Sequence, residues 1–260
     1  MEIDEIDQLK YFFFDLDKTV WNWDDTIIGS EDLIESLRDS GKQVYFHTDN
    51  TLLSREAYAR KLTSMGIPAE EKDVITSGYV AARYLAKNNA NEAYVIGEKG
   101  LTDELEKHEI NIRENAEFVV VGFDRQFNYN KLKRAAKILQ NGGELVICKT
   151  EKKVRTTKDS IPNQGVLNSA LEEFAEEVTL VGKPSEIFQD TFRDYFSFLP
   201  GSSVFIGDRL EDIETGNRLG MTTAAVMSGE ISRDKLADAE DIEKPNFGLS
   251  SLTRLRKKAL

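Results

Sequence analysis

The stretch Tyr11-Phe12-Phe13-Phe14-Asp15-Leu16-Asp17-Lys18-Thr19-Val20 decides how the rest of the chain is interpreted. An apolar run of this length that ends in charged residues is typical of a strand buried on both faces of a sheet. In an extended chain, residues i and i+2 point to the same side, so Asp15 and Asp17 can share one pocket. Ligands of open α/β sheets bind at the carboxyl ends of the strands. A lone D-x-D also suits a simple turn, because Asp is common in turns, and later parts of the chain decide between the two.

The rest of the chain alternates apolar strands with amphipathic helices. Early helices are expected after Ser30 and Ser54, which we predict to be N-caps. Strands are expected at 11–14, 43–46, 73–76, 93–97, 118–122, 144–148, 178–181, 202–206 and, as the final core strand, 222–227. Irregular loops are expected at 21–25 and 149–158. A β-α-β order predicts parallel strands with right-handed crossovers, so the expected fold class is α/β with a Rossmann-like, doubly wound parallel sheet.

Composition limits the classes of function. The 260 residues include 46 acidic and 34 basic ones, which gives a formal charge of −12 and argues against a nucleic-acid-binding surface. Cys148 is the one cysteine, so no internal disulfide can form, which fits a reducing cytoplasm. Its apolar neighbours predict a buried core position instead of a nucleophile. No apolar run approaches the ~18 residues of a membrane span, and the acidic start does not resemble a signal peptide.

Four predicted strand ends carry polar groups of kinds that cooperate. These groups are Asp15 with Asp17, Thr48, Lys183, and Asp208 with Asp212. Together they supply a nucleophile, an acid/base, a hydroxyl donor, a fixed cation and metal-binding carboxylates. This combination overturns the simple-turn interpretation of the first two aspartates.

The chemistry of these groups converges on phosphoryl transfer. A carboxylate such as Asp15 can attack phosphorus and form an aspartyl-phosphate. Because a phosphate monoester is doubly negative, a divalent cation held by oxygen ligands such as Asp15 and Asp208 would reduce the repulsion, with Asp212 in contact with it or just behind. Lys183 and Thr48 would neutralise and hydrogen-bond the phosphoryl oxygens. Asp17 would protonate the leaving alkoxide and later deprotonate water.

At this point the sequence resembles the haloacid dehalogenase (HAD) superfamily. The matching motifs are D-x-D-x-T at 15–19, the strand that ends at Thr48, the G-K-P lysine at Lys183, and G-D-x-x-x-D at 207–212. The chain looks most like subfamily IIA, the nitrophenylphosphatase-like or NagD-like enzymes with a large α/β cap. The resemblance implies a catalytic core at 1–78 and 180–260, and a cap domain at 79–179 inserted between the second and third motifs. Capped relatives often pair through their caps, which makes a homodimer through the cap an expectation.

The resemblance also implies roles for the motif residues. Asp15 would be the nucleophile and Asp17 the acid/base, Thr48 would bind phosphate, and Lys183 would orient it. Asp15, the carbonyl of Asp17, and Asp208 would hold Mg²⁺, with Asp212 as a further metal-site candidate. Asp49 and Asn50 follow Thr48 in the second motif and are expected at the substrate.

The sequence departs from the family pattern at three places. Lys18 stands where the family commonly has glycine, and Asp49 stands where it usually has asparagine. Asp49 therefore adds a negative charge beside an anion site, unless it points away from the phosphate. The cap loop that often reads the substrate is here 149–153, and Lys149 and its neighbouring lysines suggest an anionic substrate.

Trp21 and Trp23 follow the first motif and are candidates for gating or stacking on substrate, although core packing explains a tryptophan there equally well. His47 and His108 have no metal-ligand partner at useful spacing, and we expect them to be structural or exposed.

The function expected from the sequence is a Mg²⁺-dependent phosphomonoesterase that hydrolyses a small phosphorylated metabolite. Candidates are sugar phosphates, nucleotides, phosphoglycolate and glycerol phosphate. The main alternative is a weakly active or inactive HAD-fold protein that binds a phosphometabolite or a protein partner, which Lys18 and Asp49 motivate. A dehalogenase would not need Asp208 and Asp212 as metal ligands, whereas a phosphomutase shares the motifs.

Overall fold

The computed structural model describes residues 6, 8–22, 25–155, 159–227 and 229–256. The apolar stretch at the start forms β1 (Tyr11–Asp15), as predicted, and Phe12, Phe13 and Phe14 are fully buried. The ring of Phe13 packs against the ring of Phe192 at a centroid distance of 4.9 Å. Burial on both faces explains why this strand is a continuous apolar run without polar alternation.

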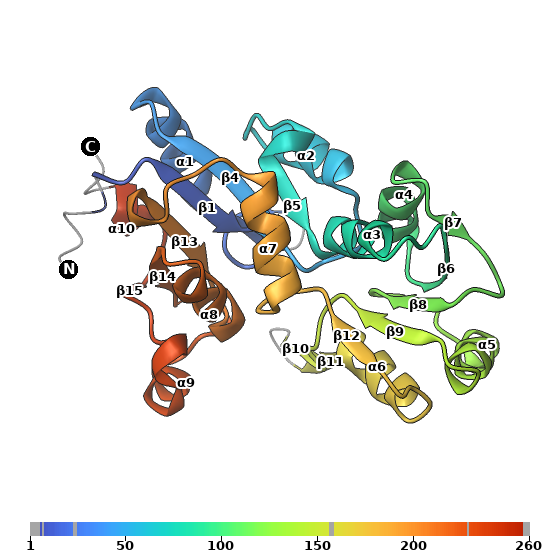
Figure 1. The fold of residues 1–260 in the computed structure, drawn as a ribbon. Helices are drawn as coiled ribbons and strands as arrows, with labels where there is room; N and C mark the ends of the chain where they lie inside the picture. Colours follow the sequence, from blue (N-terminus) through green and yellow to red (C-terminus); the bar gives the residue numbers. More distant parts are fainter. Residues whose placement is uncertain (1–5, 7, 23–24, 156–158, 228, 257–260) are drawn as a thin grey trace. The chain divides into compact units, whose positions relative to one another are not determined.

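β1 lies inside a six-stranded sheet of order β15-β14-β13-β1-β4-β5. β1 pairs in parallel with β13 (Ser203–Gly207) on one side and with β4 (Gln43–Thr48) on the other. β14 (Thr222–Val226) pairs in parallel with β13 and with β15 (Phe247–Leu249). The predicted α/β class and parallel sheet are therefore confirmed, and the carboxyl ends of β1, β4 and β13 lie at one edge (Figure 1).

A second sheet of five strands has the order β12-β9-β8-β6-β7. Its strands are β6 (Glu92–Ile96), β7 (Asn111–Ile112), β8 (Phe118–Val121), β9 (Glu144–Ile147) and β12 (Val178–Leu180), and every neighbouring pair is parallel. Val119, Val121 and Leu145 are fully buried members of its core cluster. This cluster gives the second sheet an apolar core of its own.

The remaining elements complete the chain in order. The strands are β2 (Trp21–Asn22), β3 (Asp25–Thr26), β5 (Val74–Thr76), β10 (Lys153–Arg155) and β11 (Ser160–Pro162), and the α-helices are α1 (Ser30–Asp39), α2 (Arg55–Ser64), α3 (Ser77–Lys87), α4 (Lys99–Lys107), α5 (Tyr129–Gln140), α6 (Gln164–Glu172), α7 (Glu186–Tyr195), α8 (Leu210–Arg218), α9 (Arg233–Asp238) and α10 (Thr253–Arg256). Short 3₁₀ helices lie at Glu71–Asp73, Pro200–Ser202 and Asp241–Glu243.

The chain divides into two compact units. The first unit comprises Met1–Thr48, Ala59–Val74 and Phe192–Leu260, and the second comprises Asp49–Tyr58 and Ile75–Thr191. Each unit is built from discontinuous segments. The assignment of 1–78 with 180–260 as a catalytic core and of 79–179 as a cap remains a proposal.

Several local predictions were wrong. Trp21–Asn22 and Asp25–Thr26 pair as the antiparallel strands β2 and β3, where an irregular loop is expected. Lys153–Arg155, within the expected loop 149–158, forms β10 and pairs antiparallel with β11. Strands of two or three residues are too short to show the alternation of apolar and polar residues that indicates a strand. All three residues of β11 are exposed, so this segment resembles a loop in sequence. The strand at 222–227 is not the last one of the sheet, because β15 lies beyond it. Its three residues include Gly248, which weakens the strand pattern.

Ser30 was also assigned wrongly as an N-cap. The N-cap of α1 is Gly29, which has a φ of 86°, and no side chain caps this helix. The hydroxyl of Ser30 instead shares its one hydrogen between the carbonyl oxygens of Ile27, at 2.7 Å, and Val20, at 3.0 Å. Ser54, in contrast, accepts a hydrogen bond from the main-chain N–H of Ala57 at the start of α2, as an N-cap should.

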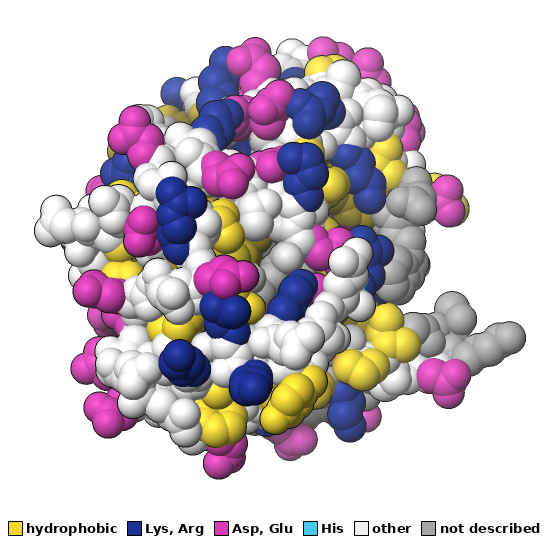
Figure 2. Space-filling view, turned by 90° about the vertical axis from the view of Figure 1, so that its right-hand side faces the viewer, with side chains coloured by type: hydrophobic (Ala, Val, Ile, Leu, Met, Phe, Trp, Pro, Cys, Tyr) yellow, Lys and Arg dark blue, Asp and Glu magenta, His cyan; other side chains and the backbone are white. Residues whose placement is uncertain are grey.

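On the face shown in Figure 2, lysine and arginine side chains lie among aspartate and glutamate side chains. This mixture of charges is what a solvated surface of an acidic protein presents.

Candidate active site

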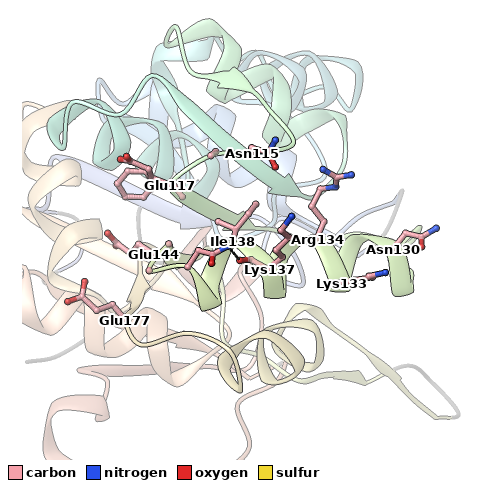
Figure 3. Close-up of a pocket in the computed structure, with 14 residues that line it drawn as sticks. Asn115, Glu117, Asn130, Lys133, Arg134, Lys137, Ile138, Glu144 and Glu177 are labelled. Atoms are coloured by element: carbon pink, nitrogen blue, oxygen red, sulfur yellow. Dashed lines mark hydrogen bonds between the residues drawn. The ribbon is translucent and has the colours of Figure 1, made fainter.

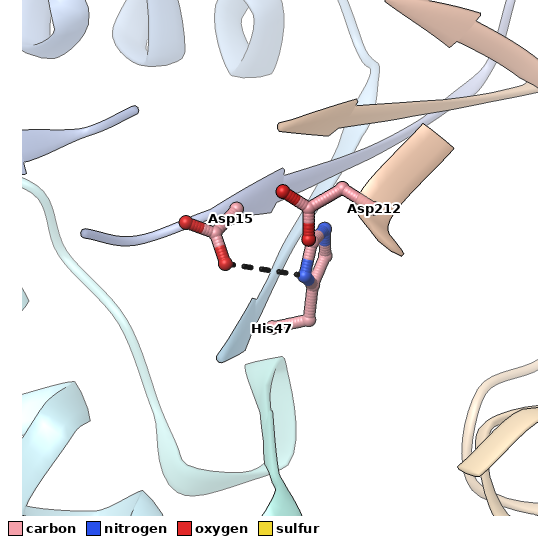
Figure 4. A group of neighbouring side chains, drawn as sticks. All are labelled: Asp15, His47 and Asp212. Carbon is pink, nitrogen blue, oxygen red and sulfur yellow. Dashed lines mark ion pairs between the residues drawn. The ribbon is translucent and has the colours of Figure 1, made fainter. Parts of the chain in front are cut away.

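The register between β1 and β4 brings Asp15 and His47 together. The two residues are paired across the strands, and both are buried. Nδ1 of His47 lies 3.7 Å from Oδ1 of Asp15 (Figure 4). The imidazole stacks on the ring of Phe205 at a centroid distance of 3.9 Å, which fixes its plane. The expectation that His47 is structural or exposed did not include this neighbour, and the residue is buried beside the predicted nucleophile.

Asp212 joins this pair from the first turn of α8. The ligand atoms of Asp15, His47 and Asp212 all lie within 4.8 Å of one another. Figure 4 shows the three side chains gathered together. Oδ2 of Asp212 accepts a hydrogen bond of 3.1 Å from the main-chain N–H of Arg209, which orients the carboxylate. A Cβ at Gly207 would lie 2.3 Å from that oxygen, so the G-D motif needs glycine for the aspartate to pack there.

Asp208 follows β13 and is fully buried. Its Oδ2 accepts a hydrogen bond of 2.8 Å from the main-chain N–H of Glu230. Its Oδ1 is buried and has no hydrogen-bond partner among the described residues. Burial, followed by the charge of Asp212, raises the pKa of Asp208 to about 7.

These carboxylates fit a divalent metal ion. A buried carboxylate oxygen without a partner is costly, and a cation held between several carboxylates would satisfy it. Mg²⁺ prefers carboxylate oxygens and water, whereas an imidazole nitrogen suits softer transition metals. The carboxylate oxygens of Asp15 and Asp212 are therefore the atoms of this group that suit a hard cation, and His47 lies against Asp15 as a neighbour. Asp208 is not one of the three residues whose ligand atoms lie within 4.8 Å of one another.

Asp17 is held by the tryptophan four residues later. The indole Nε1–H of Trp21 donates a hydrogen bond of 2.9 Å to Oδ1 of Asp17. Trp21 is 1% exposed, and the ammonium group of Lys61 lies 4.7 Å from the centroid of its ring system. This placement favours the packing alternative for Trp21 over stacking on substrate. Trp23 lies outside the described residues.

Lys18 occupies the turn between Asp17 and Trp21. Its φ is 62°, in the left-handed region, and its main-chain N–H donates to the carbonyl of Trp21 at 2.6 Å. The side chain forms an ion pair with Glu230, the residue whose N–H contacts Asp208. The lysine that departs from the family pattern is therefore paired with a carboxylate of its own unit.

In the second unit, Asp49 contacts the loop that carries Lys183. Oδ1 of Asp49 accepts a hydrogen bond of 3.1 Å from the main-chain N–H of Lys183, and both residues are buried. The carbonyl of Asp49 accepts a further bond from the hydroxyl of Ser77. Asn50 turns its side chain onto its own loop, where Oδ1 accepts from the N–H of Leu52. Thr48, the last residue of β4 in the first unit, is 2% exposed.

Lys149 and Cys148 lie at the end of β9. Nζ of Lys149 pairs with Oε2 of Glu151 at 2.9 Å, so a neighbouring carboxylate balances its charge. Cys148 is buried, as predicted for a core position, and burial and the nearby Asp49 raise the pKa of its thiol well above the ordinary value. A thiol held in its neutral form does not suit a nucleophile.

A hollow of about 910 Å³ lies within the second unit, beside α5 (Figure 3). Lys133, Arg134 and Lys137 line it together with Glu144 and Glu177. None of the residues that the motifs single out lines this hollow.

The sequence interpretation did not find three residues of the first unit. His47 stands directly before Thr48, and its place opposite Asp15 becomes visible only with the register of β1 and β4. Glu230 and Gly229 lie about 20 residues beyond Asp208 in a loop without a motif. Their contacts to Asp208 could not be found from residue spacing.

Known proteins resemble the chain over most of its length. A family model described as haloacid dehalogenase-like hydrolase matches residues 12–111, and a HAD-hydrolase-like model matches residues 180–255. The chain is 31% identical to the chloroplastic phosphoglycolate phosphatase 1A of Arabidopsis thaliana, over 95% of this chain and 76% of the relative. It is 30% identical to the 5′-nucleotidase YutF of Bacillus subtilis, over 94% of this chain and 96% of the relative.

Among solved structures, a 4-nitrophenylphosphatase from Thermotoga maritima superposes with a TM-score of 0.89 at 28% identity and covers 100% of both chains. The fold and the relatives together define a hydrolase that is built on a parallel α/β sheet. The chain belongs to the haloacid dehalogenase-like hydrolase family. The predictions of this family, of its nitrophenylphosphatase-like branch and of a phosphatase are confirmed. Among the described residues, no helix has the length and apolar composition needed to span a membrane.

Proposed function

We propose that the chain is a Mg²⁺-dependent phosphomonoesterase that acts through an aspartyl-phosphate on Asp15. The observation that carries this proposal is the group of buried carboxylates. Asp15 and Asp212 offer ligand atoms within 4.8 Å of each other, and Oδ1 of Asp208 is buried without a partner among the described residues. A dehalogenase has no use for this excess of buried negative charge, whereas a phosphatase that holds a divalent cation does.

The proposed reaction has two steps. A carboxylate oxygen of Asp15 attacks the phosphorus atom, the bond from phosphorus to the ester oxygen breaks, and Asp17 gives its proton to the leaving alkoxide. Asp17 then takes a proton from water, whose oxygen attacks the same phosphorus atom. Inorganic phosphate leaves and the Asp15 carboxylate is restored. The hydrogen bond from Trp21 supports the acid/base role, because it holds Asp17 in one orientation.

The metal would be held by Asp15, Asp208, the carbonyl of Asp17 and, directly or through water, Asp212. When bound, Mg²⁺ supplies positive charge that offsets the repulsion between the Asp15 carboxylate and the phosphate dianion. Thr48 and Lys183 are proposed, from their motifs, to hydrogen-bond and neutralise the phosphoryl oxygens.

Asp49 is proposed to hold the main chain of Lys183 instead of binding phosphate, because its Oδ1 accepts the Lys183 N–H. Asn50 is proposed to shape its own loop. The paired states of Lys18 and Asp49 remove the main motive for an inactive, purely binding protein.

We propose a small phosphorylated metabolite as substrate. The names of the relatives, a phosphoglycolate phosphatase and a 5′-nucleotidase, support this class without choosing within it. Lys149 remains a candidate for substrate contact, although Glu151 pairs with it. A homodimer through residues 79–179 and a cytoplasmic location remain proposals.

The test is release of p-nitrophenol from p-nitrophenyl phosphate with Mg²⁺, in wild type and in Asp15→Asn. We expect turnover that a chelator abolishes and that Asp15→Asn lowers by at least about 10³-fold, the scale expected for loss of a nucleophile. Undiminished activity of Asp15→Asn would exclude the assigned nucleophile, and turnover that survives chelation would exclude the metal. A screen of phosphoglycolate, glycerol phosphate, sugar phosphates and nucleotides then identifies the substrate.

A further inference from the structure

The loop 229–231 holds Asp208 by two main-chain hydrogen bonds. The N–H of Glu230 donates to Oδ2 of Asp208 at 2.8 Å, and the N–H of Ile231 donates to its carbonyl oxygen at 2.8 Å. A Cβ at Gly229 would lie 2.1 Å from Oδ2, so the loop passes against the carboxylate. The position of this loop therefore determines where the other oxygen, Oδ1, points.

Lys18 connects this loop to the turn that carries Asp17. Its ammonium group pairs with Oε1 of Glu230, and the side chains are 23% and 11% exposed. A second cation, Nζ of Lys235, lies 4.0 Å from Oε2 of Glu230. An ion pair that is mostly removed from water is screened less than a surface pair and holds its geometry better.

The backbone conformation of Lys18 indicates that the lysine side chain forms an interaction that offsets the strain. A φ of 62° disfavours any residue with a Cβ, and glycine adopts it without strain. The turn itself is closed by main-chain hydrogen bonds from the N–H groups of Lys18 and Val20, which glycine at position 18 would also allow. The lysine side chain, through its pair with Glu230, is what glycine could not supply.

We infer that Lys18 and Glu230 form a positioning pair, which locks the turn of Asp17 to the loop that orients Asp208 and thereby sets the affinity of the site for Mg²⁺. Neither residue is a ligand, and neither touches the reacting atoms in the proposed mechanism. The inference rests on the proposed function in taking Asp208 as a metal ligand.

Two physical accounts of the pair predict opposite effects on Mg²⁺ affinity when the charge of Lys18 is removed. If the pair acts by position, removing either charge loosens the loop, and Mg²⁺ binds more weakly in both cases. If it acts only by its electric field, removing Lys18 leaves a carboxylate near the cation and strengthens binding, whereas removing Glu230 leaves an ammonium group and weakens it.

The experiment measures Mg²⁺ binding to the metal-free protein by isothermal titration calorimetry, without substrate. The variants are Lys18→Met, Glu230→Gln, which retains the main-chain N–H to Asp208, and the exchanged pair Lys18→Glu with Glu230→Lys. Lys244→Met, which breaks the exposed pair of Lys244 with Asp241 in the same unit, is the matched control. Circular dichroism and urea midpoints establish that each variant is folded.

We expect both single variants to weaken Mg²⁺ binding by about 10-fold, as changes next to metal ligands do. The exchanged pair should recover most of the loss, and the control should bind like wild type. Wild-type affinity in both single variants, or tighter binding in Lys18→Met, would overturn the inference. If Lys18→Met does not fold, Glu230→Gln and the exchanged pair decide alone: a loss that the exchange does not repair counts against the pair.

Activity separates this inference from the proposed function. A wild type that binds Mg²⁺ but releases no phosphate would contradict the proposed function and leave the binding result in place. An active wild type whose two variants bind Mg²⁺ normally would contradict the positioning pair alone.

Discussion

The main-chain N–H of Lys183 donates a hydrogen bond to Oδ1 of Asp49 over 3.1 Å, and both residues are at most 4% exposed. The carboxylate of Asp49, which stands where the second motif usually has asparagine, therefore accepts a hydrogen bond from a main-chain N–H group. Oδ1 of Asp49 also lies 3.2 Å from the position that a Cβ at Gly182 would occupy, so the loop closes tightly around the carboxylate. This relationship makes Asp49 a support for the loop of the predicted phosphate-binding lysine.

Replacing Asp49 tests this support. Asp49→Ala leaves the buried N–H of Lys183 without its acceptor, which should lower the free energy of unfolding by about 1–3 kcal/mol and kcat/KM by roughly 10-fold or more. Asp49→Asn keeps an acceptor oxygen and should stay near wild type in both. Urea unfolding and p-nitrophenyl phosphate kinetics measure the two effects. Equal damage in both variants would mean that the charge, and not the hydrogen bond, is what the loop needs.

Trp21→Phe removes the indole N–H that orients Asp17 and keeps an aromatic ring in the buried position. If Asp17 is the general acid, kcat/KM, which reports the first step and not the later attack of water, should fall by about 10-fold on an alkyl ester such as glycerol phosphate. The loss should be smaller on p-nitrophenyl phosphate, because nitrophenolate leaves readily without a proton. Steady-state kinetics on the two substrates give the comparison. The same loss on both would remove the link between Trp21 and proton donation.

Gly229→Ala introduces a Cβ 2.1 Å from Oδ2 and 2.3 Å from Cβ of Asp208. The clash should displace Asp208, weaken Mg²⁺ binding, and destabilise the protein by about 1–3 kcal/mol. Gly248→Ala is the matched control, because no atom of the described residues lies within 4 Å of a Cβ at that position. Calorimetric titration and urea unfolding report both effects. Mg²⁺ binding by Gly229→Ala that equals that of the control would show that Asp208 has room to move.

The raised pKa of Asp208 predicts how stability changes with pH in the absence of metal. With a pKa of about 7 in the folded state, Asp208 keeps a proton that the unfolded chain releases at lower pH. The contribution of Asp208 to the free energy of unfolding should therefore be largest below about pH 4 and should fall as pH rises towards 7, by at most about 4 kcal/mol.

Urea unfolding in a chelator, at about pH 5 and about pH 8, measures this loss. Asp208→Asn should remove most of it, and added Mg²⁺ should restore more stability to wild type at the higher pH, where the carboxylate is charged. An equal pH dependence in wild type and Asp208→Asn would contradict the assignment.

The sequence was sufficient for the α/β class and the main parallel strands, because these depend on short-range patterns. β1 was predicted from four apolar residues, and Asp15, Asp208 and Asp212 from their positions after strands and at the start of a helix. The parallel order followed from alternating strands and helices, which the pairing of β1 with β4 and β13 confirms.

The sequence was not sufficient where contacts join distant segments. Lys18 and Glu230 are 212 positions apart, and Asp49 and Lys183 are 134 apart. No spacing rule connects such pairs, so Lys18 and Asp49 appeared only as departures from a motif. The neighbour of His47, Asp15, lies on another strand, and only the register of β1 with β4 places the two residues together.

The central claim is that the phosphoryl group is transferred to the carboxylate of Asp15. The variant Asp17→Asn tests this claim most directly. This variant keeps the nucleophile but cannot activate water, so the covalent product should accumulate. Mixed rapidly with p-nitrophenyl phosphate and Mg²⁺, it should release about one equivalent of nitrophenol per site in a burst, followed by slow turnover. Mass spectrometry of acid-quenched peptides should then find the phosphoryl group on Asp15. A full burst with phosphate on another residue, or turnover by wild type with no covalent phosphate trapped in Asp17→Asn, would contradict the account.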